Sequence, residues 1–127
     1  KITRNPNALL MQTRHEDKYQ LADDIKKDFK EEIEVDSWGG PLNILEFSPK
    51  GINKAYALNY LLKAMRKSTN DLIDFGDEHN DTEMLELAKT GYAMKNASSV
   101  LLPHANEQIE WTNEEDGVAR KLQELFL

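Results

Sequence analysis

The chain has 127 residues, of which 16 are Lys or Arg and 23 are Asp or Glu, so its formal charge is −7. A chain of this length is typical of one domain that buries roughly two-thirds of its unfolded surface. The acidic balance leaves no basic stripe for a phosphate backbone, which excludes nucleic acid as the main partner. No apolar run approaches the roughly 20 residues of a membrane span, so no membrane is expected as a partner.

The chain contains no cysteine, which excludes disulfides, thiolate metal sites and thiol nucleophiles together. This composition is typical of a reducing compartment, and the cytoplasm is therefore the expected location. No signal peptide is visible. Since the first residue is Lys1 and not methionine, we expect the sequence to be cut from a longer one.

The amino-terminal part predicts one helix and three strands. The short apolar run at residues 8–12 predicts a buried strand, and the spacing of Leu21, Ile25 and Phe29 predicts an amphipathic helix. The mixed charges between these apolar residues indicate a solvated face. Strands predicted at 33–37 and 42–47 flank a glycine-rich turn, which favours an antiparallel pair. Trp38 in that turn either covers apolar atoms, which is the interpretation we favour, or faces a substrate.

The sequence after Pro49 alternates between helices and strands. The predicted helices are one capped by Asn53, one over 82–88, a short one from 96 limited by Pro103, and one capped by Asn113. The predicted strands are at 72–75, 92–94 and 108–111. This alternation predicts a parallel sheet with helices on both faces. We place a boundary near 47–50, which gives one unit over 1–47 and a second over 48–127.

The stretch at residues 72–81 brings an apolar strand directly into a group of acids. The strand ends at Phe75, Gly76 allows a sharp turn, and the polar residues that follow include Asp77, Glu78, Asn80 and Asp81. In α/β sheets, ligands gather at the carboxyl ends of strands, where this turn is expected to lie. Carboxylates crowded in this way repel one another unless a cation sits among them. Hard oxygen ligands without cysteine favour Mg²⁺ over zinc.

Lys54 stands at the start of a predicted helix, just beyond a strand. Transfer of a phosphoryl group needs positive charge, because the group carries negative charge on its non-bridging oxygens. We expect Lys54, Asp77 and Asp81 to converge on one pocket rim, although they are far apart in the chain. A surface lysine is the alternative, but a cation is unfavourable at a helix amino terminus, so we prefer the functional interpretation.

Two segments, 50–58 and 75–85, together resemble the haloacid dehalogenase superfamily, and within it the Cof-type phosphatases with a large α/β cap. Segments 92–97 and 113–119 match late segments of that branch. The resemblance is close from about residue 47 to the end, and looser before it. It implies an α/β fold: the carboxyl half of a Rossmann-like parallel sheet core, plus the last α+β part of a cap domain.

The resemblance also implies roles for four residues. Lys54 would hold the phosphoryl group and the nucleophile, and Asn80 would form a hydrogen bond near the phosphate. Asp77 would bind Mg²⁺ directly, whereas Asp81 would support the metal through water or orient Lys54. The reaction in this family passes through an aspartyl-phosphate that water then hydrolyses. His79, at a variable position of the turn, is expected to face solvent.

One part of the family pattern is missing from this chain. No Asp-x-Asp-Gly segment follows an early apolar strand, so the nucleophile and the general acid are absent. We therefore expect a carboxyl-terminal fragment of a Mg²⁺-dependent phosphatase of small phosphorylated metabolites, inactive alone. The alternative is a non-catalytic α/β module that self-associates through an exposed sheet edge and apolar face. The expected partners are a second copy of the chain or the missing amino-terminal half.

Overall fold

The computed structural model describes residues 4–30 and 32–127, which form two three-stranded sheets. The strands are β1 (Leu9–Gln12), β2 (Ile33–Ser37), β3 (Ile44–Pro49), β4 (Ile73–Gly76), β5 (Thr90–Ala93) and β6 (Glu107–Gln108). The first sheet is antiparallel with the order β1-β3-β2, and the second is parallel with the order β4-β5-β6. The predicted mixed α/β fold with a parallel sheet is confirmed.

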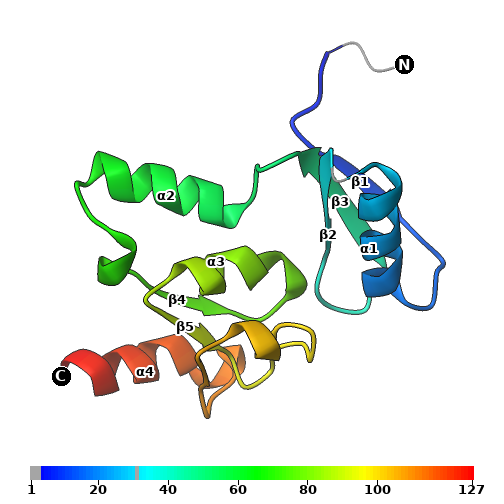
Figure 1. The fold of residues 1–127 in the computed structure, drawn as a ribbon. Helices are drawn as coiled ribbons and strands as arrows, with labels where there is room; N and C mark the ends of the chain where they lie inside the picture. Colours follow the sequence, from blue (N-terminus) through cyan, green and yellow to red (C-terminus); the bar gives the residue numbers. More distant parts are fainter. Residues whose placement is uncertain (1–3, 31) are drawn as a thin grey trace.

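Helices cover the two sheets differently. The α-helices are α1 (Lys18–Asp28), α2 (Lys54–Ala64), α3 (Thr82–Leu87) and α4 (Gly117–Phe126). Figure 1 shows α2 and α3 above the parallel sheet and α4 below it, as the alternating pattern predicts. The helix α1 covers only the outer face of the antiparallel sheet, and its inner face is turned toward the parallel sheet (Figure 1).

The antiparallel sheet has one apolar face and one acidic face. Val35 and Leu45 form a buried cluster with Ala22 of α1. Side chains alternate along a strand, so the neighbouring Asp36 and Glu46 point away from α1. These two residues are direct partners in the register of β2 and β3. The acidic face is therefore the one that faces the rest of the molecule.

Two predictions for the amino-terminal part are wrong. The strand β1 is exposed rather than buried, with Leu10 57% exposed, because it lies at the edge of its sheet. The charged face of α1 is not wholly solvated either. Lys18 is only 7% exposed, and its ammonium group donates hydrogen bonds to the carbonyl oxygens of Trp38 and Gly40. This contact ties the start of α1 to the turn between β2 and β3.

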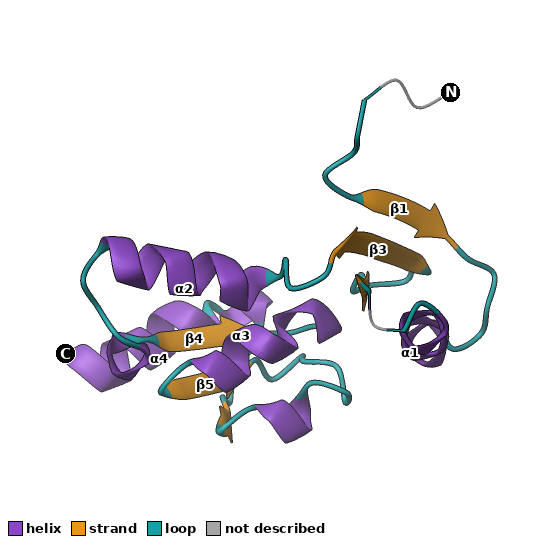
Figure 2. Cartoon of the chain, turned by 45° about the horizontal axis from the view of Figure 1, so that its top comes forward, coloured by secondary structure: helices purple, strands orange, loops and turns teal. Residues whose placement is uncertain are grey.

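The parallel sheet is built around an apolar cluster of Tyr92, Met94 and Ile109, against which Phe75 packs. Four short 3₁₀ helices connect its elements: η1 (Thr69–Asp71), η2 (His79–Asp81), η3 (Leu102–His104) and η4 (Asn113–Glu115). Figure 2 shows β4 and β5 running side by side beneath α2. Their carboxyl ends consequently lie at one edge of the sheet.

Three predictions after β5 are wrong in detail. Residues 96–99 form turns and no helix, because the Asn96 side chain accepts a hydrogen bond from the Asn113 N–H instead of capping a helix. Pro103 lies inside η3, where a missing N–H costs little. The strand expected at 108–111 is the shorter β6. Asn113 caps no helix, because Thr112 is the N-cap of η4 and Asp116 is the N-cap of α4.

The two sheets contact each other through α1 and η2. The Tyr19 hydroxyl donates a hydrogen bond to Glu78 Oε1 over 2.5 Å. The Tyr19 ring also packs edge-on against His79, with 5.9 Å between the ring centroids. The division of the chain at residues 47 and 48 stays a prediction, and β3 itself continues to Pro49.

Candidate functional site

An ion pair joins the start of α2 to the end of η2. Asn53 caps α2 by accepting a hydrogen bond from the Tyr56 N–H over 2.9 Å, which fixes Lys54 as the first helical residue. The Lys54 ammonium group contacts Asp81 Oδ1 directly. Asp81 is only 4% exposed, whereas 48% of the Lys54 side chain is exposed. The buried carboxylate thus holds an amine that stays accessible from outside.

The acidic turn is folded around the other oxygen of Asp81. Asp81 Oδ2 accepts hydrogen bonds from the backbone N–H groups of Asp77, at 3.0 Å, and Glu78, at 3.3 Å. Gly76 makes this approach possible, because a Cβ atom there would lie 2.7 Å from the Asp81 Cβ. A side chain at position 76 would therefore displace the residue that orients Lys54.

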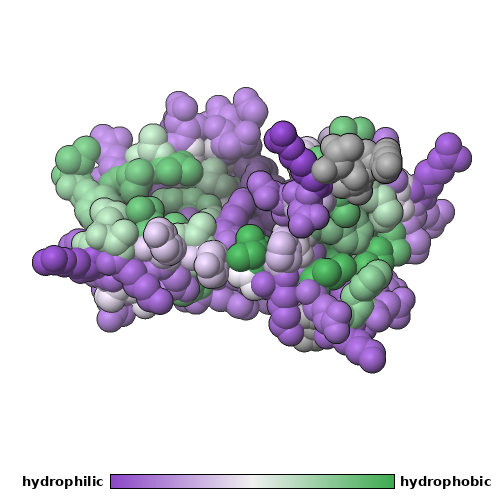
Figure 3. Space-filling view, turned by 90° about the horizontal axis from the view of Figure 1, so that it is seen from above, coloured by the Kyte–Doolittle hydropathy of each residue, from purple (hydrophilic) through white to green (hydrophobic). Residues whose placement is uncertain are grey.

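Lys54, Asp77 and Asn80 line one pocket of about 450 Å³. The other residues around it are Trp38, Gly39, Gly40, Glu46 and Glu78. Seen from above, Figure 3 shows a hollow with hydrophilic atoms around it between the two parts of the molecule. The structure thus brings together the residues that the sequence predicts to converge, and Asp81 supports the pocket from behind Lys54.

The electrostatics of the pocket favour a cation near Asp77. Burial raises the pKa of Asp77, and the negative charges of Asp81 and Glu78 raise it further, while Lys54 lowers it. Among the described residues, no side chain donates a hydrogen bond to the Asp77 carboxylate. Both Asp81 oxygens, in contrast, are already hydrogen-bonded to Lys54 and to the turn. For Asp81, the geometry therefore favours a role in orienting Lys54 over a role as a direct metal ligand.

The chain supplies only part of a metal site. Within residues 4–30 and 32–127, no group of three or more His, Asp or Glu side chains is arranged to hold a metal ion. Mg²⁺ commonly keeps several waters and binds one or two carboxylates. Asp77, whose carboxylate is exposed at the pocket, fits one such ligand. The residues present therefore fit one protein ligand of a Mg²⁺ ion, and not a complete coordination shell.

The opposite wall of the pocket comes from the antiparallel sheet. Trp38 Nε1 donates a hydrogen bond of 2.8 Å to Glu46 Oε2, and both residues line the pocket. The structure therefore favours a Trp38 that faces a substrate over the Trp38 that covers apolar atoms, which the sequence favours. Glu46 was missed in the sequence, although it alternates with the apolar Leu45 and Phe47. That alternation could have placed its side chain on the polar face of β3.

His79 and Tyr19 support the turn from the side. His79 is half-buried against the Tyr19 ring, so the prediction that it faces solvent is wrong. Burial, together with the hydrogen bond to Glu78 and its charge, raises the pKa of Tyr19 to about 12. Tyr19 consequently remains a neutral donor to Glu78 at any ordinary pH. This contact holds the acidic turn against α1.

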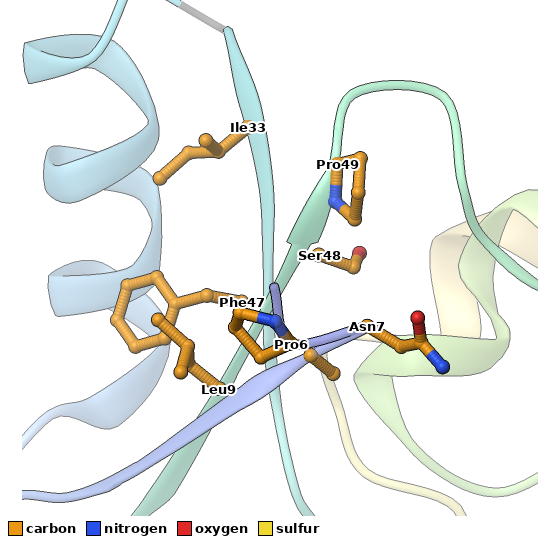
Figure 4. A pocket seen from close by; sticks show the side chains of 8 residues that line it. Pro6, Asn7, Leu9, Ile33, Phe47, Ser48 and Pro49 are labelled. Atoms are coloured by element: carbon orange, nitrogen blue, oxygen red, sulfur yellow. The ribbon is translucent and has the colours of Figure 1, made fainter. Parts of the chain in front are cut away.

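A second hollow, of about 230 Å³, lies on the antiparallel sheet and contains none of the predicted site residues. Figure 4 shows Ile33 and Phe47 of this hollow pointing toward α1, with Leu9 beside Phe47. Its lining is mostly apolar and offers no titratable group. We therefore assign the candidate site to the pocket between the sheets.

The chain is similar to known proteins over nearly all of its length. It is 36% identical over 119 residues to the 5-amino-6-(5-phospho-D-ribitylamino)uracil phosphatase YitU of Bacillus subtilis, covering 94% of this chain and 44% of that protein. It also superposes on the crystal structure of SMU.1108c from Streptococcus mutans UA159, with a TM-score of 0.81 and 32% identity over 93% of this chain and 44% of that one.

A haloacid dehalogenase-like hydrolase from Bacillus subtilis gives a TM-score of 0.78 with 26% identity, over 94% of this chain and 41% of that one. The chain thus spans less than half the length of the relatives it matches. No helix in the described ranges is long and apolar enough to cross a bilayer. The sequence profile of the haloacid dehalogenase-like hydrolases matches residues 1–122. The chain belongs to the haloacid dehalogenase-like hydrolases.

Proposed function

We propose that this chain supplies the phosphate-binding part of a Mg²⁺-dependent phosphatase that acts on small phosphorylated metabolites. The observation that carries the proposal is the accessible Lys54 amine, held by buried Asp81 at the rim of a pocket that Asp77 and Asn80 also line. Such an amine is suited to a phosphoryl group, whose oxygens gain stabilisation from a fixed positive charge.

Each residue has a distinct task in this proposal. Lys54 contacts the non-bridging oxygens of the phosphoryl group, and Asn80 donates its amide N–H to the same group. Asp81 keeps the Lys54 ammonium in place. Asp77 would hold Mg²⁺, which supplies further neutralisation of the phosphoryl charge when it is bound.

The proposed reaction follows the aspartyl-phosphate route of the family. An aspartate carboxylate forms a bond to phosphorus while the bond to the leaving alcohol breaks, and the alcohol takes up a proton from a general acid. Water then attacks the acyl phosphate, which releases inorganic phosphate and regenerates the aspartate. Residues 1–127 contain no Asp-x-Asp-Gly segment for these steps. We therefore propose that the chain alone has no turnover.

The name of a relative supports a phosphomonoester substrate. The Bacillus subtilis relative is named for a compound with one phosphate on a ribityl chain. Because this chain covers 44% of that protein, its substrate is a candidate for the whole protein that contains this chain. We propose the class, small phosphomonoesters, and include that compound among those to be assayed.

The test uses protein expressed from the complete reading frame that contains this chain, with p-nitrophenyl phosphate as the substrate. Lys54→Ala and Asp77→Asn should each lower kcat/KM by roughly 10²-fold or more, because each removes charge stabilisation of the transferred group. Lys63→Ala is the matched control, since Lys63 is an exposed lysine of the same helix outside the pocket. Near-normal kcat/KM in either pocket variant would reject the proposal.

A further inference from the structure

Glu46 lies across the pocket from the residues proposed to bind phosphate. It projects from β3 on the face opposite α1 and lines the pocket of about 450 Å³ with Lys54, Asp77 and Asn80. It also lines an adjoining hollow of about 350 Å³, again with Lys54 and Asn80. A phosphoester with its phosphate at Lys54 would therefore extend its leaving group toward Glu46.

The orientation of Glu46 is fixed by a neighbouring indole. Trp38 Nε1 donates to Glu46 Oε2, and no described side chain donates to Glu46 Oε1. Two lysines of the neighbouring helix α1 are engaged elsewhere: Lys18 binds backbone carbonyls of the turn, and Lys26 pairs with Glu34 at 2.9 Å. Lys54, which lines both hollows with Glu46, is paired with Asp81. One carboxylate oxygen of Glu46 is thus left to accept hydrogen bonds from the pocket.

The position of this carboxylate is unfavourable for folding alone. Asp36 is the direct cross-strand partner of Glu46, and like charges in that arrangement destabilise a sheet. Both acids line the adjoining hollow. Unfavourable local choices of this kind are concentrated at functional sites.

We propose that Glu46, oriented by Trp38, is a specificity-determining residue for the leaving group, and this rests on the proposed phosphatase function. Glu46 accepts hydrogen bonds from hydroxyl or amino groups at the far end of the substrate. The same negative charge repels a second anionic group there. The site therefore selects polyhydroxylated phosphomonoesters with an uncharged far end over those that carry a carboxylate.

The experiment compares two substrates that differ only at the far end. D-Glucitol 6-phosphate ends in a CH₂OH group, and 6-phospho-D-gluconate has a carboxylate at the same carbon. In the wild-type protein from the complete reading frame, kcat/KM should favour the glucitol compound by roughly tenfold or more, as expected for a charged hydrogen-bond partner. Glu46→Gln should bring this ratio close to one, mainly through KM, because it removes the charge at nearly constant volume.

Two further variants separate orientation from charge. Trp38→Phe keeps an aromatic ring but loses the N–H donor, so the substrate ratio should fall to an intermediate value. Glu32→Gln is the matched control: Glu32 is an exposed acid of the same sheet region outside both hollows, and the wild-type ratio should persist. Circular dichroism and thermal melting verify that each variant is folded.

The outcomes separate this inference from the proposed function. An unchanged ratio in Glu46→Gln, with p-nitrophenyl phosphate still hydrolysed, overturns the role of Glu46 and leaves the phosphatase proposal standing. If the wild type hydrolyses none of the three esters, the phosphatase proposal fails. In that event both sugar compounds are titrated against the protein by calorimetry, and equal affinities, or equal absence of binding, overturn the inference as well.

Discussion

Asp36 carries the largest shift among the carboxyl groups of the antiparallel sheet. Its pKa is raised to about 6, mainly by burial and further by the negative charges of Glu83 and Glu34, while His79 and Lys26 act in the opposite direction. The pKa of an unfolded aspartate is near 4, so the folded state binds the proton more tightly. Ionisation of Asp36 therefore lowers the stability as the pH rises from about 4 through 6, and the loss is complete above that window.

Asp36→Asn should consequently stabilise the protein, and more so at high pH. We expect a gain of about 1–2 kcal/mol at pH 7.5, discounted for the partial exposure of the carboxyl group, and a smaller gain at pH 5. Thermal melting of both proteins at the two pH values measures the difference. An equal gain at both values, or a larger one at pH 5, contradicts the prediction.

Some site residues could be located from the sequence and others could not. Lys54 and Asp81 are each placed by a local signal, a helix start in one case and a strand end followed by glycine in the other. The alternation around Glu46 places its side chain on the polar face of β3 but not at the pocket, and Tyr19 carries no local signal. Their place at the pocket and at the acidic turn depends on strand register and on how the two sheets pack, which single-sequence periodicity does not contain.

The packing of α3 on the parallel sheet depends on Gly91 of β5. A Cβ atom at this position would lie 2.6 Å from the Leu85 carbonyl oxygen and 2.9 Å from the Leu85 Cα. Both are backbone atoms of α3, so the helix itself would have to move. Gly91 thus allows α3 and β5 to approach more closely than any other residue would permit.

Gly91→Ala should lower the free energy of unfolding by about 1–3 kcal/mol, as overpacking of a tight contact does. Urea denaturation of the chain measures this loss. Thr90→Ala, in the same strand and half-exposed, is the control and should cost less than about 1 kcal/mol. Equal losses in the two variants would show that strand propensity, and not the helix contact, is responsible.

Elements with clear sequence signals were predictable, and elements without them were not. The helix α2 has many apolar residues in phase, and the short strand β4 is marked by an apolar run that ends at a glycine, so their type was evident. The region from 96 to 112 contains only turns, the single 3₁₀ turn η3 and the two-residue strand β6. In this region the side chain of Asn96 binds a distant backbone group, and such long-range contacts override local preference.

At the scale of the whole molecule, one surface is open to self-association. The strand β4 is at the end of its sheet, and α2 exposes Tyr60 at 73% and Leu61 at 52%. Leu61 and Met65 also line an apolar hollow of about 310 Å³. Figure 3 shows apolar atoms gathered on the side of the molecule where α2 lies. These features are the surface through which the isolated chain is expected to associate with itself.

We expect the isolated 127-residue chain to show concentration-dependent association in sedimentation velocity. Leu61→Lys should weaken this association by several-fold, because it places a charge in the apolar surface. Lys63→Ala, on the same helix, should leave it unchanged. A single monomeric boundary at every concentration would contradict the prediction, and the intact mass of the natural protein would show whether the chain occurs alone.

The two tryptophans of the chain lie in different surroundings. Trp38 is at the pocket and is 39% exposed, whereas Trp111 lies beside Arg120 of α4, with 5.8 Å between the guanidinium carbon and the ring centroid. Their ultraviolet fluorescence therefore has two spatially separate sources. The variant Trp111→Phe keeps one tryptophan, Trp38, at the pocket. Its fluorescence therefore reports on the pocket without an attached dye, which is useful because the chain has no cysteine for labelling.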